Sequence, residues 1–243
     1  LCGELPKDNR AGCWNGTKYQ PIPLVGGASQ DLALKIMENA DLYPGVEVQS
    51  VPIRSYPSLE GENVAHVLGY VGSVTDEDLK NPEVNYYRNE VVGKTGLETK
   101  YNQYLRGTPG VRTFLVNRKE VVTKQNKNIQ AIAGNNLITN IDAKLQAAVE
   151  RSLEAAVKRA RASGYRGDSG AAIVLEIKTG RVLAMASYPT YDPAIWQKGL
   201  TVKQAEDLFS EAKGVPALSR PLQGLFAPAS TFKSISVVAA AAA

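Results

Sequence analysis

The sequence predicts an α+β protein of two domains, residues 1–135 and 136–243. Three observations lead to this prediction. A turn-forming stretch at 134–136 interrupts the chain. Apolar residues then recur at four-residue intervals from 145 to 157, which is typical of an amphipathic helix. Two strand-like runs flank a glycine turn within 170–186, so we expect helices packed on an antiparallel sheet.

The elements of the first domain follow from local patterns. Gly, Pro and Asn are frequent up to residue 30 and predict irregular structure. Beyond it, apolar periodicity, β-branched residues and turn residues mark the elements in turn. We expect a helix over 30–39, extended segments over 46–56, a short acidic helix capped by Thr75, a stretch over 93–98 that leads into a helix ending at about 106, and a hairpin over 111–124.

The second domain is expected to open on a short strand, and Asp142 can cap the long amphipathic helix after it. Lys178-Thr179-Gly180 forms the turn between the two later strands, because glycine supplies the positive φ that such a turn needs. The expected elements are a strand over 137–141, the helix, strands over 170–177 and 182–186, a loop over 188–193, a helix over 202–213 and a buried helix after Ser230.

Composition points to an ordinary globular protein. Hydrophobic residues make up 44% and charged residues 21% of the chain, and the formal net charge is +4. Basic and acidic residues are interleaved, so we expect no nucleic-acid partner. The longest apolar run, near the last residue, is far shorter than the ~20 residues that a membrane span needs. The chain opens at Leu1 without Met or a signal sequence, which is expected of a fragment of a longer protein.

Cys2 and Cys13 flank a loop with little helix or strand character. They could close a disulfide outside the cytosol, because such a loop has little core to order it; two free thiols near a frayed end are the alternative. His66 is the only histidine and lies among apolar neighbours, so a structural role is favoured over a catalytic one. A zinc site is not expected, and no metal or cofactor is implied.

Ser230-Thr-Phe-Lys233 places a hydroxyl and an amine three residues apart, on one face of a helix. The amine can then take the hydroxyl proton and activate a weak nucleophile. The pattern alone is weak, and it also occurs at Ser210-Glu-Ala-Lys213, within a charged segment that is expected to be surface. At Ser230 the context is stronger, because Pro228 and Ala229 form an entry turn and an apolar helix follows.

S-x-x-K is paired with S-D-N and K-T-G in penicillin-binding proteins and β-lactamases. Here K-T-G occurs at Lys94-Thr95-Gly96 and at Lys178-Thr179-Gly180, both ahead of Ser230. The first is predicted to lead into a helix and the second to form a hairpin turn, so neither suits a catalytic strand. No S-x-N triplet exists in the chain.

Taken together, these motifs resemble a class B penicillin-binding protein, most closely the elongation-type penicillin-binding protein 2 branch of actinobacteria. The similarity extends over nearly the whole chain. The stretches 65–72, 92–98 and 104–107 resemble a non-catalytic, dimerisation-type pedestal domain that is elongated. The stretches 139–146, 170–186 and 221–233 resemble the opening of a serine transpeptidase domain of the β-lactamase-like fold, here truncated.

The resemblance implies a peptidoglycan D,D-transpeptidase. Ser230 would attack the D-Ala-D-Ala carbonyl of a stem peptide, Lys233 would be the general base, and the Ser230 N–H would supply half an oxyanion hole. β-Lactams would acylate the same serine. Ala229 stands where glycine is common in the family. Because the later motifs are missing, the chain as written is expected to have no meaningful activity.

The resemblance also implies location and partners. The parent protein would be anchored at the extracytoplasmic face of the bacterial membrane by an N-terminal helix absent from this chain. The pedestal would dock a membrane glycosyltransferase of the SEDS type. The alternative function is a binding module in which the pedestal is the working part of an elongation complex. A β-lactamase or β-lactam sensor is disfavoured by the long upstream region, and a division-type class B protein stays open.

Overall fold

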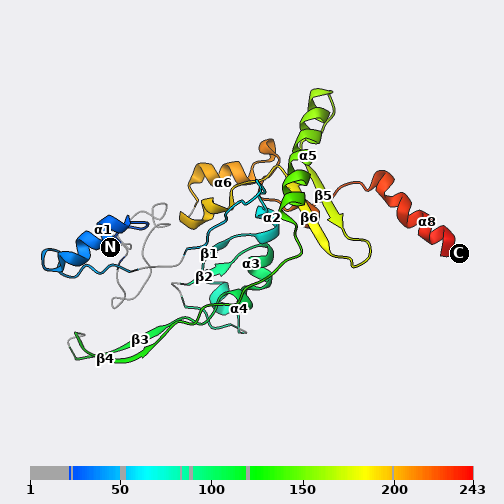
Figure 1. The fold of residues 1–243 in the computed structure, drawn as a ribbon. Coiled ribbons are helices and arrows are strands. Elements are labelled where there is room, and N and C mark those ends of the chain that lie inside the picture. The colour runs from blue at the N-terminus through cyan, green and yellow to red at the C-terminus, as the bar shows by residue number, and fades with distance from the viewer. Residues whose placement is uncertain are drawn as a thin grey trace. The chain divides into compact units, whose positions relative to one another are not determined.

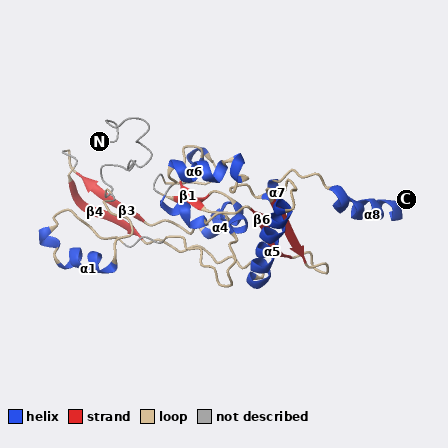
Figure 2. Cartoon of the chain, turned by 90° about the horizontal axis from the view of Figure 1, so that it is seen from above, coloured by secondary structure: helices blue, strands red, loops and turns tan. Residues whose placement is uncertain are grey.

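The computed structural model describes residues 22, 24–49, 53–82, 84–87, 90–118, 121–198 and 200–242. The chain divides into two compact units, one made of Leu1–Ser55 and Gly72–Val92, the other of Tyr56–Val71 and Gly93–Ala243. Helices alternate with two-stranded sheets (Figures 1 and 2), which confirms the α+β prediction. Cys2 and Cys13 lie outside the described residues, so their pairing stays a prediction.

The first unit contains the predicted N-terminal helix. This helix, α1 (Gln30–Glu38), begins where the Ser29 hydroxyl accepts a hydrogen bond from the Leu32 N–H at 3.2 Å. A 3₁₀ turn, η3 (Ala40–Leu42), follows. The described residues of the stretch predicted to be extended, 46–49 and 53–56, form no strand. Their β-branched residues favour extended backbone, but a strand also needs a neighbour to complete its hydrogen bonds.

A small sheet and a capped turn complete this unit. Strand β1 (Val71–Ser73) pairs with β2 (Val91–Gly93). Between them, the Thr75 N–H donates to the Asp78 carboxylate at 2.7 Å, and the Thr75 hydroxyl accepts from the Asp78 N–H at 3.3 Å. The Thr75 side chain therefore holds the start of the segment by hydrogen bonds, although the helix is a single 3₁₀ turn, η4 (Asp78–Lys80), whose N-cap residue is Glu77 rather than Thr75.

The second unit begins with short helices. They are α2 (Ala65–Leu68), α3 (Gly96–Lys100) and α4 (Asn102–Leu105). The single helix predicted up to residue 106 is therefore broken at Tyr101, whose φ of −110° and ψ of 20° are not helical. Gly96 has a φ of +58°, and a Cβ there would lie 2.7 Å from the Gly69 N atom. Glycine thus lets the start of α3 approach the end of α2.

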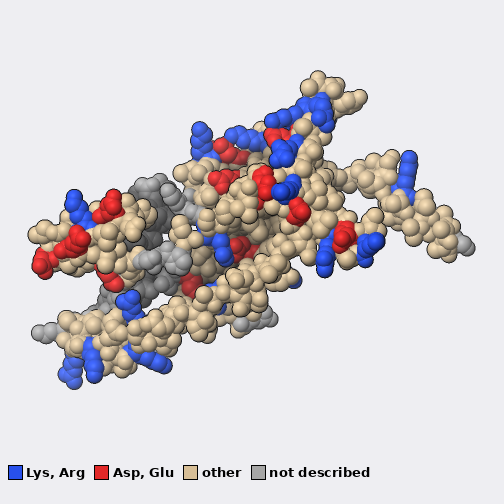
Figure 3. Space-filling view, viewed as in Figure 1, with Lys and Arg blue, Asp and Glu red and all other residues tan. Residues whose placement is uncertain are grey.

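The predicted hairpin is formed by β3 (Val111–Val116) and β4 (Val122–Ile129), paired antiparallel with Val111 opposite Ile129. Every described residue of β4 is exposed. Among the described residues between 111 and 129 the charged side chains are all basic, and Figure 3 shows Lys and Arg without Asp or Glu along this hairpin. These basic residues are Arg112, Arg118, Lys124 and Lys127.

The core of the second unit is a long helix on a hairpin. Helix α5 (Ala143–Ala162) is capped by Asp142, whose carboxylate accepts from the Leu145 N–H at 2.9 Å. It packs against β6 (Val182–Tyr188), which pairs antiparallel with β5 (Gly170–Leu175). The turn between the strands has Gly180 at a φ of +72°, as predicted.

One short strand predicted in this region is wrong. Residues 137–141 are not a strand, and the Asp142 N–H, immediately after them, donates to the Leu183 carbonyl at 2.9 Å. The stretch Leu137–Ile141 pairs with no described strand and serves as a connection into α5. A segment of five residues with β-character is ambiguous from pattern alone.

Gln146 fixes the helix to the sheet. Its side chain is 0% exposed; its amide N–H donates to the Met185 carbonyl at 2.9 Å, and its amide oxygen accepts from the Met185 N–H at 2.7 Å. The side chain therefore hydrogen-bonds to β6 much as a neighbouring strand would. Because buried backbone groups need partners, these two hydrogen bonds fix the position of α5 along β6.

The remaining elements form the chain's last third. The predicted helix over 202–213 is interrupted at Ser210, where the backbone is extended with a ψ of 124°. Helix α7 was not predicted. These elements are η5 (Pro193–Lys198), α6 (Val202–Phe209), η6 (Glu211–Lys213), α7 (Arg220–Gln223), η7 (Ala229–Phe232) and α8 (Lys233–Ala242).

The helix expected to be buried after Ser230 is exposed. No residue of α8 is buried, and Val237 and Val238 are 67% and 69% exposed. Among the described elements, the neighbouring turn η7 is the one that packs substantially on it (Figure 2). An apolar helix is buried only if something covers it, and the described part of the chain supplies no such cover. Within that part, no helix has the length and apolar character needed to cross a bilayer.

Candidate active site

The predicted nucleophile and base lie at the junction of a 3₁₀ turn and a helix. Ser230 is in η7, and Lys233 is the first residue of α8, with helical φ and ψ of −61° and −33°. Side chains three residues apart in a 3₁₀ turn are eclipsed, so the hydroxyl and the amine leave the backbone on the same side. Both side chains are exposed. The backbone at Ser230 and Lys233 therefore has the local helical geometry that their three-residue spacing predicts.

The entry turn before Ser230 is tight. The Pro228 carbonyl accepts from the Thr231 N–H at 3.0 Å, and the Thr231 hydroxyl donates to the same oxygen. Between them, Ala229 has a φ of +44°, in the left-handed region. A residue with a Cβ is strained there by about 1–2 kcal/mol relative to glycine. The alanine that stands where the family commonly has glycine thus occupies a position whose backbone favours glycine.

The second S-x-x-K match differs in its surroundings. Lys213 forms an ion pair with Asp207, and both side chains are about half exposed. Ser210 ends α6 rather than beginning a helix of the length of α8. The amine of this lysine is engaged by the Asp207 carboxylate, and no described contact joins it to Ser210.

A buried arginine anchors the segment that leads to Ser230. Arg220 is 5% exposed, and its guanidinium donates to the Val215 carbonyl at 3.3 Å, the Leu218 carbonyl at 3.2 Å and the Gly214 carbonyl. Burial lowers the pKa of Arg220. This role of Arg220 does not show in the sequence, because the carbonyls that accept hydrogen bonds from a buried arginine leave no mark in the pattern of side chains.

Glu150 on α5 joins distant parts of the sequence. Its carboxylate accepts from the Asn63 N–H at 2.8 Å, the Val64 N–H at 3.2 Å and the Gln146 amide at 2.7 Å. The Asn63 amide also donates to the Tyr191 carbonyl at 3.0 Å. Residues 63–64, which precede α2, are thereby held on α5 and on the loop after β6. Sequence gave no signal for this network, since Glu150 falls among the other charged residues of an amphipathic helix.

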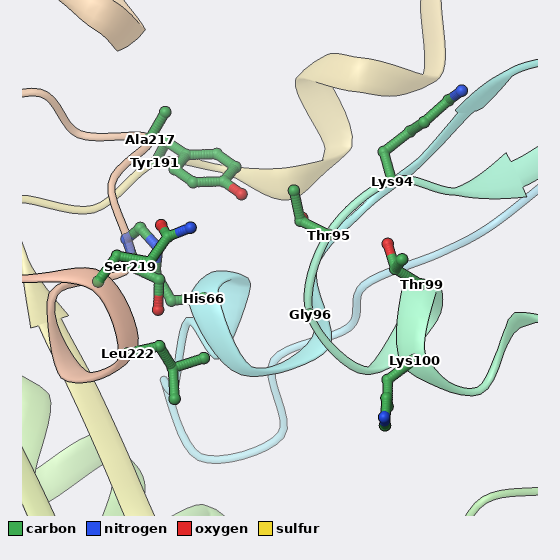
Figure 4. A pocket seen from close by; sticks show the side chains of 11 residues that line it. His66, Lys94, Thr95, Gly96, Thr99, Lys100, Tyr191, Ala217, Ser219 and Leu222 are labelled. Carbon is green, nitrogen blue, oxygen red and sulfur yellow. The ribbon is translucent and has the colours of Figure 1, made fainter. Parts of the chain in front are cut away.

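His66 has the structural role that was predicted. It is 8% exposed and contacts the Tyr191 ring edge to face at 5.3 Å between centroids. Burial lowers the pKa of His66 to about 4, so the imidazole is neutral near pH 7. Figure 4 shows its ring beside Ser219, across a cavity from Thr95 and Gly96. Among the described residues no cluster of His, Cys, Asp and Glu is suited to hold a metal ion.

The two K-T-G triplets are structural. Lys94-Thr95-Gly96 leads into α3 and lines this cavity, and Lys178-Thr179-Gly180 forms the β5–β6 turn. Neither is brought to Ser230 on a strand. Within the described part of the chain, neither triplet therefore accompanies the segment that carries Ser230 and Lys233.

Comparison with known families places the chain. Residues 4–139 match the penicillin-binding protein dimerisation domain, which is more than half of the sequence. The chain belongs to the penicillin-binding proteins. Residues 170–243 of this penicillin-binding protein match the penicillin-binding protein transpeptidase domain, a match that includes Ser230 and Lys233. A dimerisation domain followed by a transpeptidase domain confirms the class B assignment.

Relatives of this penicillin-binding protein are peptidoglycan D,D-transpeptidases. It is 33% identical to MrdA of Haemophilus influenzae over 93% of its own length and 33% of that protein. It is 30% identical to MrdA of Escherichia coli K12, over 93% of the chain and 34% of the relative. The chain thus spans about a third of the length of these relatives. The actinobacterial subtype is not tested by them and stays a prediction.

Solved structures of penicillin-binding protein 2 share its fold. The complex between penicillin-binding protein 2 and MreC from Helicobacter pylori matches with a TM-score of 0.58 and 28% identity, over 79% of this chain and 32% of that one. Penicillin-binding protein 2 of Pseudomonas aeruginosa, in complex with WCK 5153, matches with a TM-score of 0.50 and 29% identity, over 77% and 34%. These likenesses confirm the predicted succession of a pedestal and a partial transpeptidase domain.

Proposed function

We propose that this chain is the pedestal and the nucleophile-bearing part of a peptidoglycan D,D-transpeptidase. The observation that carries the proposal is the placement of Ser230 and Lys233. They share one side of a helical turn within the residues that match the transpeptidase domain. The boundary between the two domains is proposed to lie at residues 135 and 136.

In the proposed reaction Ser230 is the nucleophile and Lys233 the general base. Its amine, in the neutral form, takes the hydroxyl proton as the serine oxygen bonds to the carbonyl carbon of the stem peptide. The bond to the terminal D-Ala then breaks, and the proton passes to the leaving amine. The Ser230 N–H would stabilise the oxyanion. An amine of a second stem peptide would release the serine and complete the cross-link.

The exposure of Ser230 and Lys233 supports the proposal that other parts of a transpeptidase domain supply the remaining catalytic groups. In the described chain, Ser230 and Lys233 are surrounded by solvent, where hydrogen bonds to a developing oxyanion are weak. The second serine motif, the K-T-G strand and the other oxyanion donor would have to come from elsewhere in a transpeptidase domain. The 243-residue chain alone is therefore expected to acylate slowly or not at all.

Fluorescent penicillin tests this proposal, because β-lactams acylate the nucleophile of a transpeptidase. The protein to use carries a complete transpeptidase domain. We expect covalent labelling, its loss in Ser230→Ala, and unchanged labelling in Ser210→Ala, the matched control at the other S-x-x-K. Peptide mapping should place the label on Ser230. Persistent labelling of Ser230→Ala would remove the assignment.

Docking to other cell-wall proteins is a second proposed function, and the β3–β4 hairpin favours it. Isolated two-stranded hairpins are marginal in water, yet this one exposes Phe114, Leu115 and Val122 by 38%, 48% and 46%. The relative from Helicobacter pylori forms a complex with MreC. We propose an MreC-type protein and a SEDS-type glycosyltransferase as partners of the pedestal, at the extracytoplasmic face of a membrane to which the parent protein is anchored.

Binding of a purified MreC-type protein from the same genome would test the docking function. Phe114→Asp should weaken the complex at least tenfold if the hairpin contributes to the interface. Phe209→Asp, an exposed phenylalanine on α6, is the matched control and should leave binding unchanged. Equal binding by both variants and the parent would exclude the hairpin as the docking surface.

A further inference from the structure

The turn that carries Ser230 contains a strained residue. Ala229 has a φ of +44°, in the left-handed region where the Cβ of an L-residue lies too close to a carbonyl oxygen. Val64, Val215 and Ala229 are the described residues other than glycine that have a positive φ, and Ala229 is the exposed one of the three. It directly precedes the proposed nucleophile. Strained backbone persists where surrounding contacts enforce it, and it is common at functional sites.

Two hydrogen bonds close this turn. The Pro228 carbonyl accepts from the Thr231 N–H at 3.0 Å and from the Thr231 hydroxyl. Ala229 is therefore the second residue of a four-residue turn, and a positive φ at that position is typical of Gly, Asn and Asp. We call this conformation, with Ala229 left-handed and both bonds made, the closed turn.

The strain at Ala229 and the two hydrogen bonds have similar magnitudes. A Cβ makes the left-handed conformation about fivefold to thirtyfold less populated than it is for glycine. A typical hydrogen bond in a protein favours the folded arrangement by about twofold to tenfold. Because the two bonds to Pro228 only balance the strain, the closed turn exchanges with a relaxed turn and neither conformation excludes the other.

The closed turn matters for Ser230 because it joins two helices. Before it, α7 packs on β5 and β6, and the Arg220 N–H donates to the Ser187 hydroxyl at 3.3 Å. After it, the chain enters α8 at Lys233. Since each helix moves as a unit, a rotation at Ala229 is taken up by adjoining dihedrals, which include the φ of Ser230. That φ directs the Ser230 N–H, which is the proposed oxyanion donor.

We propose that Ala229 is a positioning residue for the acylation of Ser230, and that its Cβ keeps the closed, reactive turn only partly populated. Acylation then proceeds at its intrinsic rate multiplied by the fraction of molecules in the closed turn. The inference rests on the proposed function, because it requires Ser230 to be the nucleophile. A stem peptide and a β-lactam should be affected alike, since both acylate through the same turn.

Substitutions at position 229 test the inference in a protein with a complete transpeptidase domain. Acylation by fluorescent penicillin over a range of concentrations separates the acylation rate constant from the non-covalent affinity. Ala229→Gly should raise the rate constant about threefold to thirtyfold and leave the affinity unchanged. Ala229→Asn should raise it less, and Ala229→Val should lower it, because asparagine tolerates left-handed backbone and β-branched residues do not.

The expected order of rate constants is Gly, Asn, Ala, Val, from fastest to slowest. Helix propensity predicts a different order, with alanine the best and glycine the poorest of the four. A residue that merely helped to start the helix would follow helix propensity. The thermal unfolding midpoint of Ala229→Gly should stay nearly unchanged, because the relieved strain is offset by the greater freedom of glycine in the unfolded chain.

Thr231→Val provides a second test, because it removes the hydroxyl bond to Pro228 and keeps the N–H bond. Alone, it should lower the acylation rate constant about twofold to tenfold. Combined with Ala229→Gly, it should lower that constant by less than about twofold, since an unstrained turn no longer depends on the bond. Equal effects in the two backgrounds would show that residues 229 and 231 act independently.

Ala227→Gly is the matched control, since Ala227 is exposed, lies two residues earlier and has no positive φ. It should change the acylation rate constant by less than about twofold. The inference is overturned if Ala229→Gly gives no increase, if Ala227→Gly gives the same increase, or if the order follows helix propensity. Each of these results leaves labelling at Ser230 intact. Persistent labelling of Ser230→Ala would instead remove the proposed function, and the inference with it.

Discussion

Helix α5 and helix α8 both carry apolar residues, yet their surroundings are opposite. Val157 on α5 is 7% exposed, whereas Val238 on α8 is 69% exposed. Gln146 and Glu150 bind α5 to backbone groups of β6 and of residues 63–64. The hydrogen bonds of the α8 side chains Ser234 and Ser236 instead go to carbonyls three and four residues earlier.

The difference shows which region of the described chain is held in place by contacts among its own residues. The α5–β6 region buries side chains and satisfies their polar groups within the chain. The Ser230 segment has local helical geometry without buried side chains, and a helix of this length gains most of its stability from packing against other elements. The scaffold is thus complete where it faces the pedestal residues and incomplete where chemistry is proposed to occur.

The largest expected effect comes from Gln146→Leu. The substitution leaves the Met185 N–H and carbonyl buried without partners, and each such group costs about 1–3 kcal/mol. We expect the free energy of unfolding to fall by about 3 kcal/mol in urea denaturation. Gln125→Leu, on the exposed strand β4, should change it by less than about 0.5 kcal/mol. Equal decreases in the free energy of unfolding would mean that the Gln146 hydrogen bonds to β6 stabilise the chain no more than an exposed side chain of β4 does.

Glu150→Ala should cost about 2 kcal/mol, because the Asn63 and Val64 N–H groups and the Gln146 amide lose their common acceptor. Glu154→Ala is the control one turn further along α5. Glu154 pairs with Lys158 at 2.7 Å on the exposed side, and such a pair contributes about 0.5 kcal/mol or less. If Glu154→Ala were the more damaging, the hydrogen-bond network would not be what secures α5.

Acid should selectively weaken the buried region through His66. The pKa of His66 is about 4 in the folded chain, against 6.5 in the unfolded chain. Above pH 7 both states are neutral and the group has no effect. Between pH 6.5 and 4 only the unfolded state gains the proton, so stability falls with pH, and below pH 4 the loss is constant.

At pH 5 this linkage should lower the folding equilibrium constant by about thirtyfold relative to pH 7.5. Because carboxylates also titrate, the measurement is the difference between the parent and His66→Gln in urea denaturation at both pH values. A His66→Gln variant with the same pH dependence as the parent would show that the buried imidazole is not responsible.

The smallest expected effects on the free energy of unfolding come from valine substitutions on α5 and α8. Val157→Ala should destabilise the chain by about 1–2 kcal/mol, since it removes buried methyl groups, whereas Val238→Ala should change stability by less than about 0.5 kcal/mol. In a protein with a complete transpeptidase domain, Val238→Ala should become as costly as Val157→Ala if the rest of the domain covers α8. An unchanged, small effect there would show that α8 stays exposed.

Sequence predicted the elements whose residues carry their own signal. Helix α5 was located by its apolar spacing and by Asp142 at its start, and the β5–β6 turn by Gly180. The segment 137–141 was predicted wrongly as a strand, because apolar character does not say whether a neighbouring strand exists. The burial of α8 was wrong for a related reason: periodicity reveals an apolar side but not what lies against it.

Of the proposed active site, Ser230 and Lys233 followed from spacing, and their roles stay predictions. The Glu150 network, buried Arg220 and the His66 cavity could not be read in advance. The Glu150 network depends on backbone N–H groups far away in sequence, and Arg220 on carbonyls two to six residues away. Backbone groups are the same in every residue, so a pattern of side chains does not reveal such contacts. His66 itself was noticed only because no other histidine competes with it.

The hydrogen bonds from residues 63–64 to Glu150 affect which recombinant forms of this protein can fold. Residues 63–64 lie in the stretch that matches the dimerisation domain, and Glu150 lies beyond it. A recombination event that exchanged one domain between two distant relatives would bring together donors and acceptor that had diverged separately. We expect chimeras joined near residue 135 to express poorly unless the Glu150 partner set is carried across intact. Exchanges that keep residues 63–64 and Glu150 from one parent should be tolerated better.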